Sequence, residues 1–221
     1  QSDRDHGQAR LERGPHPQGD GRKLGPPPEA SLGSLTLGKP QVPIEVDDAT
    51  GAWSVDGVSM ILVPRHFFVN NHLAVEEALG AEKYSEIVFS AGHKSAYFWC
   101  EMEAKTHGLK GVEVFHHYMK RLSQRGWAQF KVESVDPDTG RARIRVDHSV
   151  FVLQNKGAAS RKACYMFRGW FPGALEFVAA SAGKKLKLTA TEIQCAAEGR
   201  HGHCVFETSP DRYDAERQRI Y

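Results

Sequence analysis

The sequence predicts an α+β fold, with an antiparallel sheet and helices packed on one side of it. Two observations lead to this class. Stretches with apolar residues at helical spacing occur at about 92–106, 110–125 and 160–182, whereas alternating, strand-like stretches pair across short turns within 127–146 and 185–208. Because helices and hairpins are segregated along the chain, the pattern indicates an α+β protein.

Short strands are expected before the helices, at 42–46, around 53–55 and at 59–63, where apolar residues are bounded by turn formers. A first helix around residues 73–79 is expected to end at Gly80, because glycine commonly ends helices.

The next two expected helices, at 92–106 and 110–125, each carry one apolar stripe. Cys100 lies on the first stripe and is expected to be a buried helix residue. The second helix is expected to end at Gly126. Its stripe consists of Val112, Phe115, Met119 and Leu122.

The clearest hairpin spans 127–146 and turns through the sequence Asp-Pro-Asp-Thr-Gly at 136–140. The helix expected at 160–182 contains Gly169 and Gly173 one turn apart. Since glycine has no Cβ, this pair would let another backbone approach closely.

Composition excludes several classes of protein. The 221 residues include 29 basic and 27 acidic side chains, for a formal net charge of +2, which argues against a nucleic-acid binder. No apolar run approaches the length of a membrane span, so no membrane partner is expected. No export signal is visible, and a cytoplasmic location is therefore predicted.

The first forty residues contain seven glycines, six prolines and no aromatic residue. Such a segment cannot bury enough apolar surface to offset its conformational entropy. Residues 1–40 are therefore expected to form an extended arm, which is either a free tail or a segment that wraps a partner.

Three cysteines and one glutamate form the most informative group. Cys195 and Cys204 lie on the two strands of the last predicted hairpin, close to Glu192, and Cys164 lies upstream. Three thiolates and a carboxylate complete a tetrahedral zinc site, and a site with four protein ligands is structural because no position remains for water. Alternatives are a disulfide between Cys195 and Cys204, free buried thiols, or one ligand replaced by His201 or His203.

The same residues resemble the 4-vinyl reductase domain, found in sensor modules of phenol- and toluene-responsive activators and related in fold to TRAPP-type and haem-NO-binding ligand domains. The resemblance covers about 110–208 and rests on Cys164, on Glu192-x-x-Cys195-Ala-Ala-x-Gly and on Cys204-x-Phe206. It implies that Cys164, Glu192, Cys195 and Cys204 hold a structural zinc ion. One departure is that eight residues separate the last two cysteines, where the family usually has seven.

The stretches at 63–72 and 121–127 resemble an uncharacterised extension found ahead of this domain in proteobacterial proteins near betaine and N-methyl amino-acid breakdown. The resulting prediction has four parts, which are an arm at 1–40, the extension at 41–109, the 4-vinyl-reductase-type domain at 110–208 and a tail at 209–221.

Histidines are frequent between residues 66 and 148, but no catalytic constellation accompanies them. Adjacent His116 and His117 point about 100° apart on a helix and cannot easily share a metal. His66 or His148 could act as a base, yet no nucleophile, phosphate loop or Walker motif is present.

We therefore expect a non-catalytic, zinc-stabilised protein that binds a small hydrophobic or amine-type metabolite, or that acts as an accessory protein. An alternative is an accessory subunit of a flavin-dependent N-demethylase complex, and a further alternative is a stand-alone enzyme. A protein partner is expected, either such a flavoprotein or a second copy in a homodimer.

Overall fold

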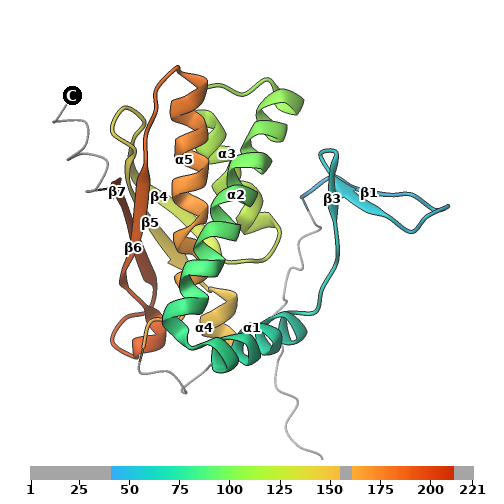
Figure 1. The fold of residues 1–221 in the computed structure, drawn as a ribbon. Helices are drawn as coiled ribbons and strands as arrows, with labels where there is room; N and C mark the ends of the chain where they lie inside the picture. Colours follow the sequence, from blue (N-terminus) through green and yellow to red (C-terminus); the bar gives the residue numbers. More distant parts are fainter. Residues whose placement is uncertain (1–40, 155–160, 212–221) are drawn as a thin grey trace, which may run out of the picture. The chain divides into compact units, whose positions relative to one another are not determined.

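A computed structural model describes residues 41–154 and 161–211 (Figure 1). The arm expected at 1–40, and residues 212–221 of the expected tail, lie outside the described residues. None of the helices in the described part is long and apolar enough to cross a membrane.

A small antiparallel sheet comes first, with strands β1 (Ile44–Val46), β2 (Trp53–Val55) and β3 (Val58–Met60). Asp56 and Gly57 connect β2 to β3 with φ angles of 53° and 76°. Two successive positive φ angles are typical of the two-residue turns that match strand twist, and Asp-Gly is a preferred pair for them.

Helix α1 (Arg65–Leu79) ends at Gly80, as predicted, and α2 (Ala81–His107) begins directly after it. The expected start of the second helix at residue 92 was wrong by eleven residues. The helix begins earlier because small and apolar residues four positions apart extend its buried face toward the N-terminus. These residues are Tyr84, Val88, Gly92 and Ala96. Helix α3 (Val112–Gln124) matches the expected helix.

The main sheet has four strands, β4 (Gln129–Asp136), β5 (Arg141–Asp147), β6 (Leu188–Gln194) and β7 (Cys204–Pro210). Their order is β4-β5-β7-β6, and every neighbouring pair is antiparallel. Both hairpins expected from the sequence, β4–β5 and β6–β7, are therefore present.

The two faces of this sheet differ in character. On β5, Ala142, Ile144 and Val146 are buried and point toward the helices. On the other face, Arg143 forms ion pairs with Glu133, at 3.0 Å, and with Glu207. Helices α2, α3 and the later α5 lie together on one side of the sheet (Figure 1). The predicted α+β class, with helices on one side, is confirmed.

The helix expected at 160–182 is shorter than predicted. Within the described residues it is replaced by a 3-10 turn, η1 (Tyr165–Arg168), and helix α5 (Trp170–Ser181). Pro172 explains the difference, since a proline is tolerated in the first turn of a helix but would break a helix that ran through it. A short helix, α4 (Val150–Gln154), precedes this region.

Helices α2 and α5 approach closely because glycines face the contact. A Cβ atom built on Gly169 would lie 2.1 Å from the carbonyl oxygen of Phe89, and one on Gly173 would lie 2.3 Å from that of His93. The close approach predicted for this glycine pair is thus present, and the approaching backbone belongs to α2.

We expect Gly173→Ala to lower the free energy of unfolding by about 1–3 kcal/mol, although alanine is the better helix former. The added methyl group would meet backbone on the facing helix, which cannot rotate away. Gly202→Ala is the matched control, because a Cβ there meets nothing within 4 Å. Chemical denaturation of both variants tests this, and equal stabilities would contradict the packing described.

Candidate metal centre

The four residues singled out in the sequence lie together in the structure. One ligand atom from each of Cys164, Glu192, Cys195 and Cys204 lies within 4.8 Å of all the others, and all four residues are buried. Cys164 immediately precedes η1, Cys195 follows β6, and Cys204 opens β7. Segments up to 40 positions apart in sequence therefore meet at one end of the main sheet.

A bulge in β6 places two of these ligands on the same side. Residues 188, 190 and 192 are buried by ordinary alternation, which would turn residue 195 outward. The pairing with β7 shifts between Glu192 and Gln194, and the intervening Ile193 is exposed. Because one extra residue reverses the alternation, Glu192 and Cys195 both face the interior.

The sulfur atoms have the spacing that zinc requires. Cys204 Sγ lies 3.7 Å from both Cys164 Sγ and Cys195 Sγ. Two thiolates bound tetrahedrally at about 2.3 Å from zinc are separated by about 3.8 Å. The alternative of a disulfide is wrong, because its sulfurs would be about 2.05 Å apart and all four cysteines are free.

The Glu192 carboxylate is buried without a hydrogen-bond partner among the described residues. Both of its oxygens are buried and have no hydrogen-bond partner among the described residues. Burial, followed by the neighbouring Cys195, raises the pKa of this carboxyl to about 9. A buried carboxylate without hydrogen bonds is costly, and a metal ion is one of the few groups that compensates it.

Neighbouring groups shift the pKa values of the thiols and donate hydrogen bonds to two of the sulfur atoms. Hydrogen bonds with Cys195 and Cys204, and then burial, raise the pKa of Cys164 well above its ordinary value, whereas Cys164 and Cys204 lower the pKa of Cys195. Backbone N–H groups of Ala163 and Ala196 donate to the sulfurs of Cys195 and Cys204 at 3.4 and 3.3 Å. Such outer contacts orient metal ligands and disperse their charge.

His203 is not among the grouped ligands. Within residues 41–154 and 161–211, the cluster around the cysteines does not include it, and its carbonyl oxygen accepts a hydrogen bond from Gln194 Nε2 at 3.0 Å. The segment between Cys195 and Cys204 contains a 3-10 turn, η2 (Ala196–Glu198), followed by Gly199 in the left-handed conformation.

The chemistry of this donor set is that of a closed site. Four protein ligands fill a tetrahedral zinc ion and leave no position for substrate or water, so the arrangement can hold a fold together but cannot activate a nucleophile. The donors also exclude a hard cation, since magnesium and calcium prefer oxygen ligands throughout.

A second buried polar group was not anticipated from the sequence. His72 Nδ1 lies 3.2 Å from the hydroxyl of Tyr84, and the Tyr165 hydroxyl donates to Glu76. Burial lowers the pKa of His72. Arg161 also contacts the Glu76 carboxylate, at 3.3 Å from Oε2. In the sequence, the four-residue spacing of His72 and Glu76 is the one feature that could have indicated this group. Their partners come from other segments of the chain.

The two histidines considered as possible bases, His66 and His148, are both exposed. Many of the aromatic residues form the core, where Phe151, Phe167 and Phe171 are fully buried.

An apolar groove of about 390 Å³ does occur beside α1, and we call it the Trp127 groove. Its lining consists of residues 59–63, Arg65, Phe68, 125–127 and Val150. The rings of Phe68 and Trp127 meet edge to face, with centroids 5.2 Å apart. Ile61 and Leu62 at its edge are 82% and 77% exposed.

Fold and site together define an α+β domain with a buried group of three cysteines and one glutamate that could hold a metal ion. A family described as "Domain of unknown function (DUF5943)" matches residues 38–133. No curated protein matches the chain in sequence.

Among solved structures, the phenol-responsive sensory domain of the transcription activator PoxR, determined with phenol, is similar with a TM-score of 0.65 and 16% identity. The match covers 80% of this chain and 90% of that one. A trafficking protein particle complex subunit 3 from Naegleria fowleri, covalently bound to palmitic acid, gives a TM-score of 0.45 and 13% identity over 67% and 91% of the two chains. The likeness to the sensory domain confirms the fold that the sequence resemblance implied.

Proposed function

We propose that this chain is a non-catalytic module that binds a small apolar molecule, with its fold stabilised by a zinc ion held by Cys164, Glu192, Cys195 and Cys204. The observation that carries the binding role is the Trp127 groove, whose volume and apolar lining are those of small-molecule sites. The fold supports the proposal, because the similar PoxR domain was solved with phenol.

The charges of the groove narrow the class of ligand. Its lining includes Arg65 and Arg125 and no acidic residue. A bound amine would therefore lack a counter-charge, whereas a neutral aromatic molecule or an aromatic carboxylate would have compatible neighbours. We accordingly favour a neutral or anionic aromatic compound over the amine-type metabolite also considered.

The proposal also covers the family of the chain, its partners and its location. We place the chain with the 4-vinyl reductase domains and regard its N-terminal part as the extension associated with betaine breakdown. An accessory role in a flavin-dependent demethylase complex, a homodimer and a cytoplasmic location also stay predictions. The exposed pair Ile61 and Leu62 is the surface that would favour a protein contact.

Binding of three probes tests the proposed groove. We expect phenol and benzoate to bind and benzylamine not to bind, as measured by calorimetry on the full chain. Leu62→Glu should weaken the binding of benzoate at least about tenfold, because a carboxylate at the edge of the groove repels the anion and removes apolar contact. Leu62 is largely exposed, so the substitution should leave folding intact.

Ile87→Glu is the matched control. Ile87 is 46% exposed on α2 and does not line the Trp127 groove, so the same change there should leave affinity unaltered. Failure of both aromatic probes to bind would overturn the proposal, as would equal weakening by the two substitutions.

A further inference from the structure

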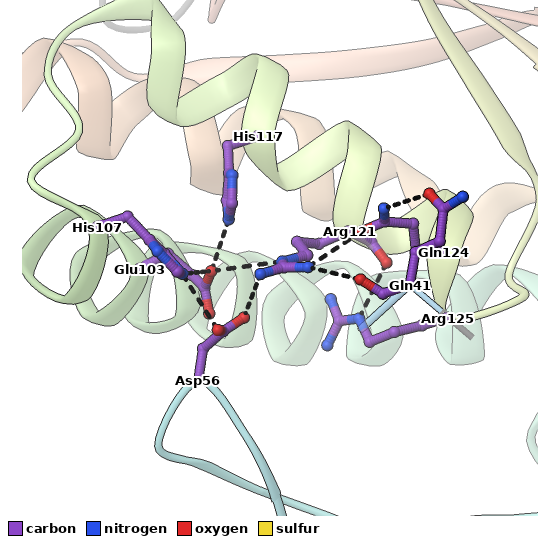
Figure 2. A network of polar contacts seen from close by, with 8 residues as sticks. All are labelled: Gln41, Asp56, Glu103, His107, His117, Arg121, Gln124 and Arg125. Atoms are coloured by element: carbon purple, nitrogen blue, oxygen red, sulfur yellow. Dashed lines mark hydrogen bonds and ion pairs between the residues drawn. The ribbon is translucent and has the colours of Figure 1, made fainter. Parts of the chain in front are cut away.

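A second cluster of metal-type side chains lies far from the cysteines in the sequence. Asp56, Glu103, His107 and His117 each offer a ligand atom, and these four atoms lie within 4.8 Å of one another. Figure 2 shows the side chains converging from the β2–β3 turn, from α2 and from α3. None of them belongs to the cysteine centre or to the Trp127 groove.

The local structure explains how four positions converge. Glu103 and His107 are four residues apart near the end of α2, so they share one face of the helix. His117 comes from α3, and Asp56 is held in its turn with a φ of 53°. Aspartate is one of the few residue types besides glycine that adopt this conformation, and the turn fixes the direction of the Asp56 side chain.

Both imidazoles present the same nitrogen to the carboxylates. His117 Nε2 lies 2.7 Å from Glu103 Oε2, and His107 Nε2 lies 3.3 Å from the same oxygen and 3.2 Å from Asp56 Oδ1. These separations are close to those between neighbouring ligands of one ion bound at about 2.0–2.2 Å.

A buried oxygen atom of the cluster has no hydrogen-bond partner among the described residues. The Glu103 side chain is 0% exposed, and its Oε1 atom has no hydrogen-bond partner among the described residues. Arg121 contacts Asp56 Oδ2 at 2.9 Å and lies 3.9 Å from Glu103 Oε2. Arg125 also interacts electrostatically with Glu103 and Asp56, so the two guanidinium groups balance the two carboxylates in formal charge. The Glu103 Oε1 atom nevertheless stays buried without a hydrogen bond from any described residue, and such an atom is costly.

We propose that Asp56, Glu103, His107 and His117 bind a divalent first-row transition-metal ion. Two imidazole nitrogens and two carboxylate oxygens are a usual set for such ions, and they differ from the thiolate set of the cysteine centre. Arg121 acts as a positioning residue, because it holds Asp56 Oδ2 and leaves Oδ1 facing His107 (Figure 2).

The ion would clip the β2–β3 hairpin onto the helices. Asp56 is the ligand from the hairpin, while the other three come from α2 and α3. The strand β1, at the edge of the same sheet, is exposed along its whole length, so the hairpin gains little from burial there. Val55 is buried and Val58 packs against the core, so a metal bond at the turn would add to the apolar contacts that hold this hairpin.

Cobalt titration of the full chain tests this site. Thiolates are the softer ligands and favour zinc, so one equivalent of zinc is expected to occupy the cysteines first, and cobalt, which binds thiolates less tightly, should not displace it. We expect one further equivalent of Co²⁺ to bind, with visible bands and no thiolate-to-cobalt charge-transfer band. His107→Ala should weaken this second binding about 100-fold or more, since even outer-shell changes cost 10–100-fold.

Matched variants separate a built site from accidental binding. His107 is the most exposed member of the cluster and its replacement should leave the fold intact, which circular dichroism checks. His117→Gln serves as a second variant. His116→Ala, at the exposed neighbouring histidine of α3, should retain the second equivalent. No second equivalent in the unaltered chain, or equal loss in His116→Ala, would overturn the proposal and leave an ion-pair network.

Discussion

Cys204→Ser is expected to abolish stoichiometric zinc and to lower the free energy of unfolding by at least about 3 kcal/mol. The physical reason is that binding of a structural zinc ion contributes directly to folding. The proposed ligands also join the segment before η1 to the β6–β7 hairpin, so losing one releases both. In a chain of this length the loss corresponds to a fall of about 10 °C in the melting temperature.

Metal analysis of the purified chain and thermal unfolding measure this effect together. Cys100→Ala is the control, because Cys100 is a fully buried thiol on α2 that lies outside the ligand group. It should keep its zinc and lose only the packing of one sulfur atom. The zinc proposal would fail if the unaltered protein contained no zinc, or if Cys204→Ser melted at the same temperature.

Phe167→Ala should have an effect of similar size by a different mechanism. Phe167 lies in η1, three positions after Cys164, and is completely buried. Its ring lies 4.9 Å from that of Trp170 and 5.3 Å from those of Phe130 and Phe151, between centroids. Truncating a buried phenylalanine leaves a cavity and typically costs 3–5 kcal/mol.

Denaturant unfolding of zinc-saturated protein isolates this packing effect. Phe98→Ala makes the same chemical change at a side chain that is 55% exposed on α2, and it should cost less than about 1 kcal/mol. Retention of zinc by Phe167→Ala would show that core packing and metal binding contribute separately to the free energy of unfolding. A change below about 1 kcal/mol for Phe167→Ala would contradict the packing described.

Local patterns predicted the parts of the fold in which neighbours in sequence are neighbours in space. The β4–β5 hairpin follows from alternation on either side of a turn at 136–140, and the ends of α1 and α3 follow from Gly80 and Gly126. Alternation of side chains and the conformational freedom of glycine act over a few residues, so a single sequence records them directly.

Longer elements were harder to bound for physical reasons. The first part of α2 was missed because its buried stripe runs through the small residue Gly92, which carries little apolar signal. The helix expected from residue 160 was overextended because the stripe containing Cys164 and Phe167 continues through a 3-10 turn. Apolar spacing alone does not distinguish a helix from a turn that packs against the same core.

The two clusters of metal-type side chains differ in how far the sequence predicted them. Cysteine is a rare residue, and Cys164, Cys195 and Cys204 were predicted to share a site with Glu192 from their types, their spacing and the resemblance to a known domain. Aspartate, glutamate and histidine are ordinary surface residues, and no property of Asp56 or His117 in the sequence connects them. Only the packing of the hairpin against α2 and α3 brings them together.

By itself, the sequence determined the α+β class and the two main hairpins, because each depends on residue type and short-range spacing. It also predicted which three cysteines and which glutamate lie together, through their residue types and a resemblance to a known domain. The tertiary structure alone decided that the β6 bulge turns Glu192 and Cys195 to one side, and that Asp56 meets Glu103, His107 and His117. These outcomes depend on strand register and on contacts between distant segments, which arise only when the core is packed.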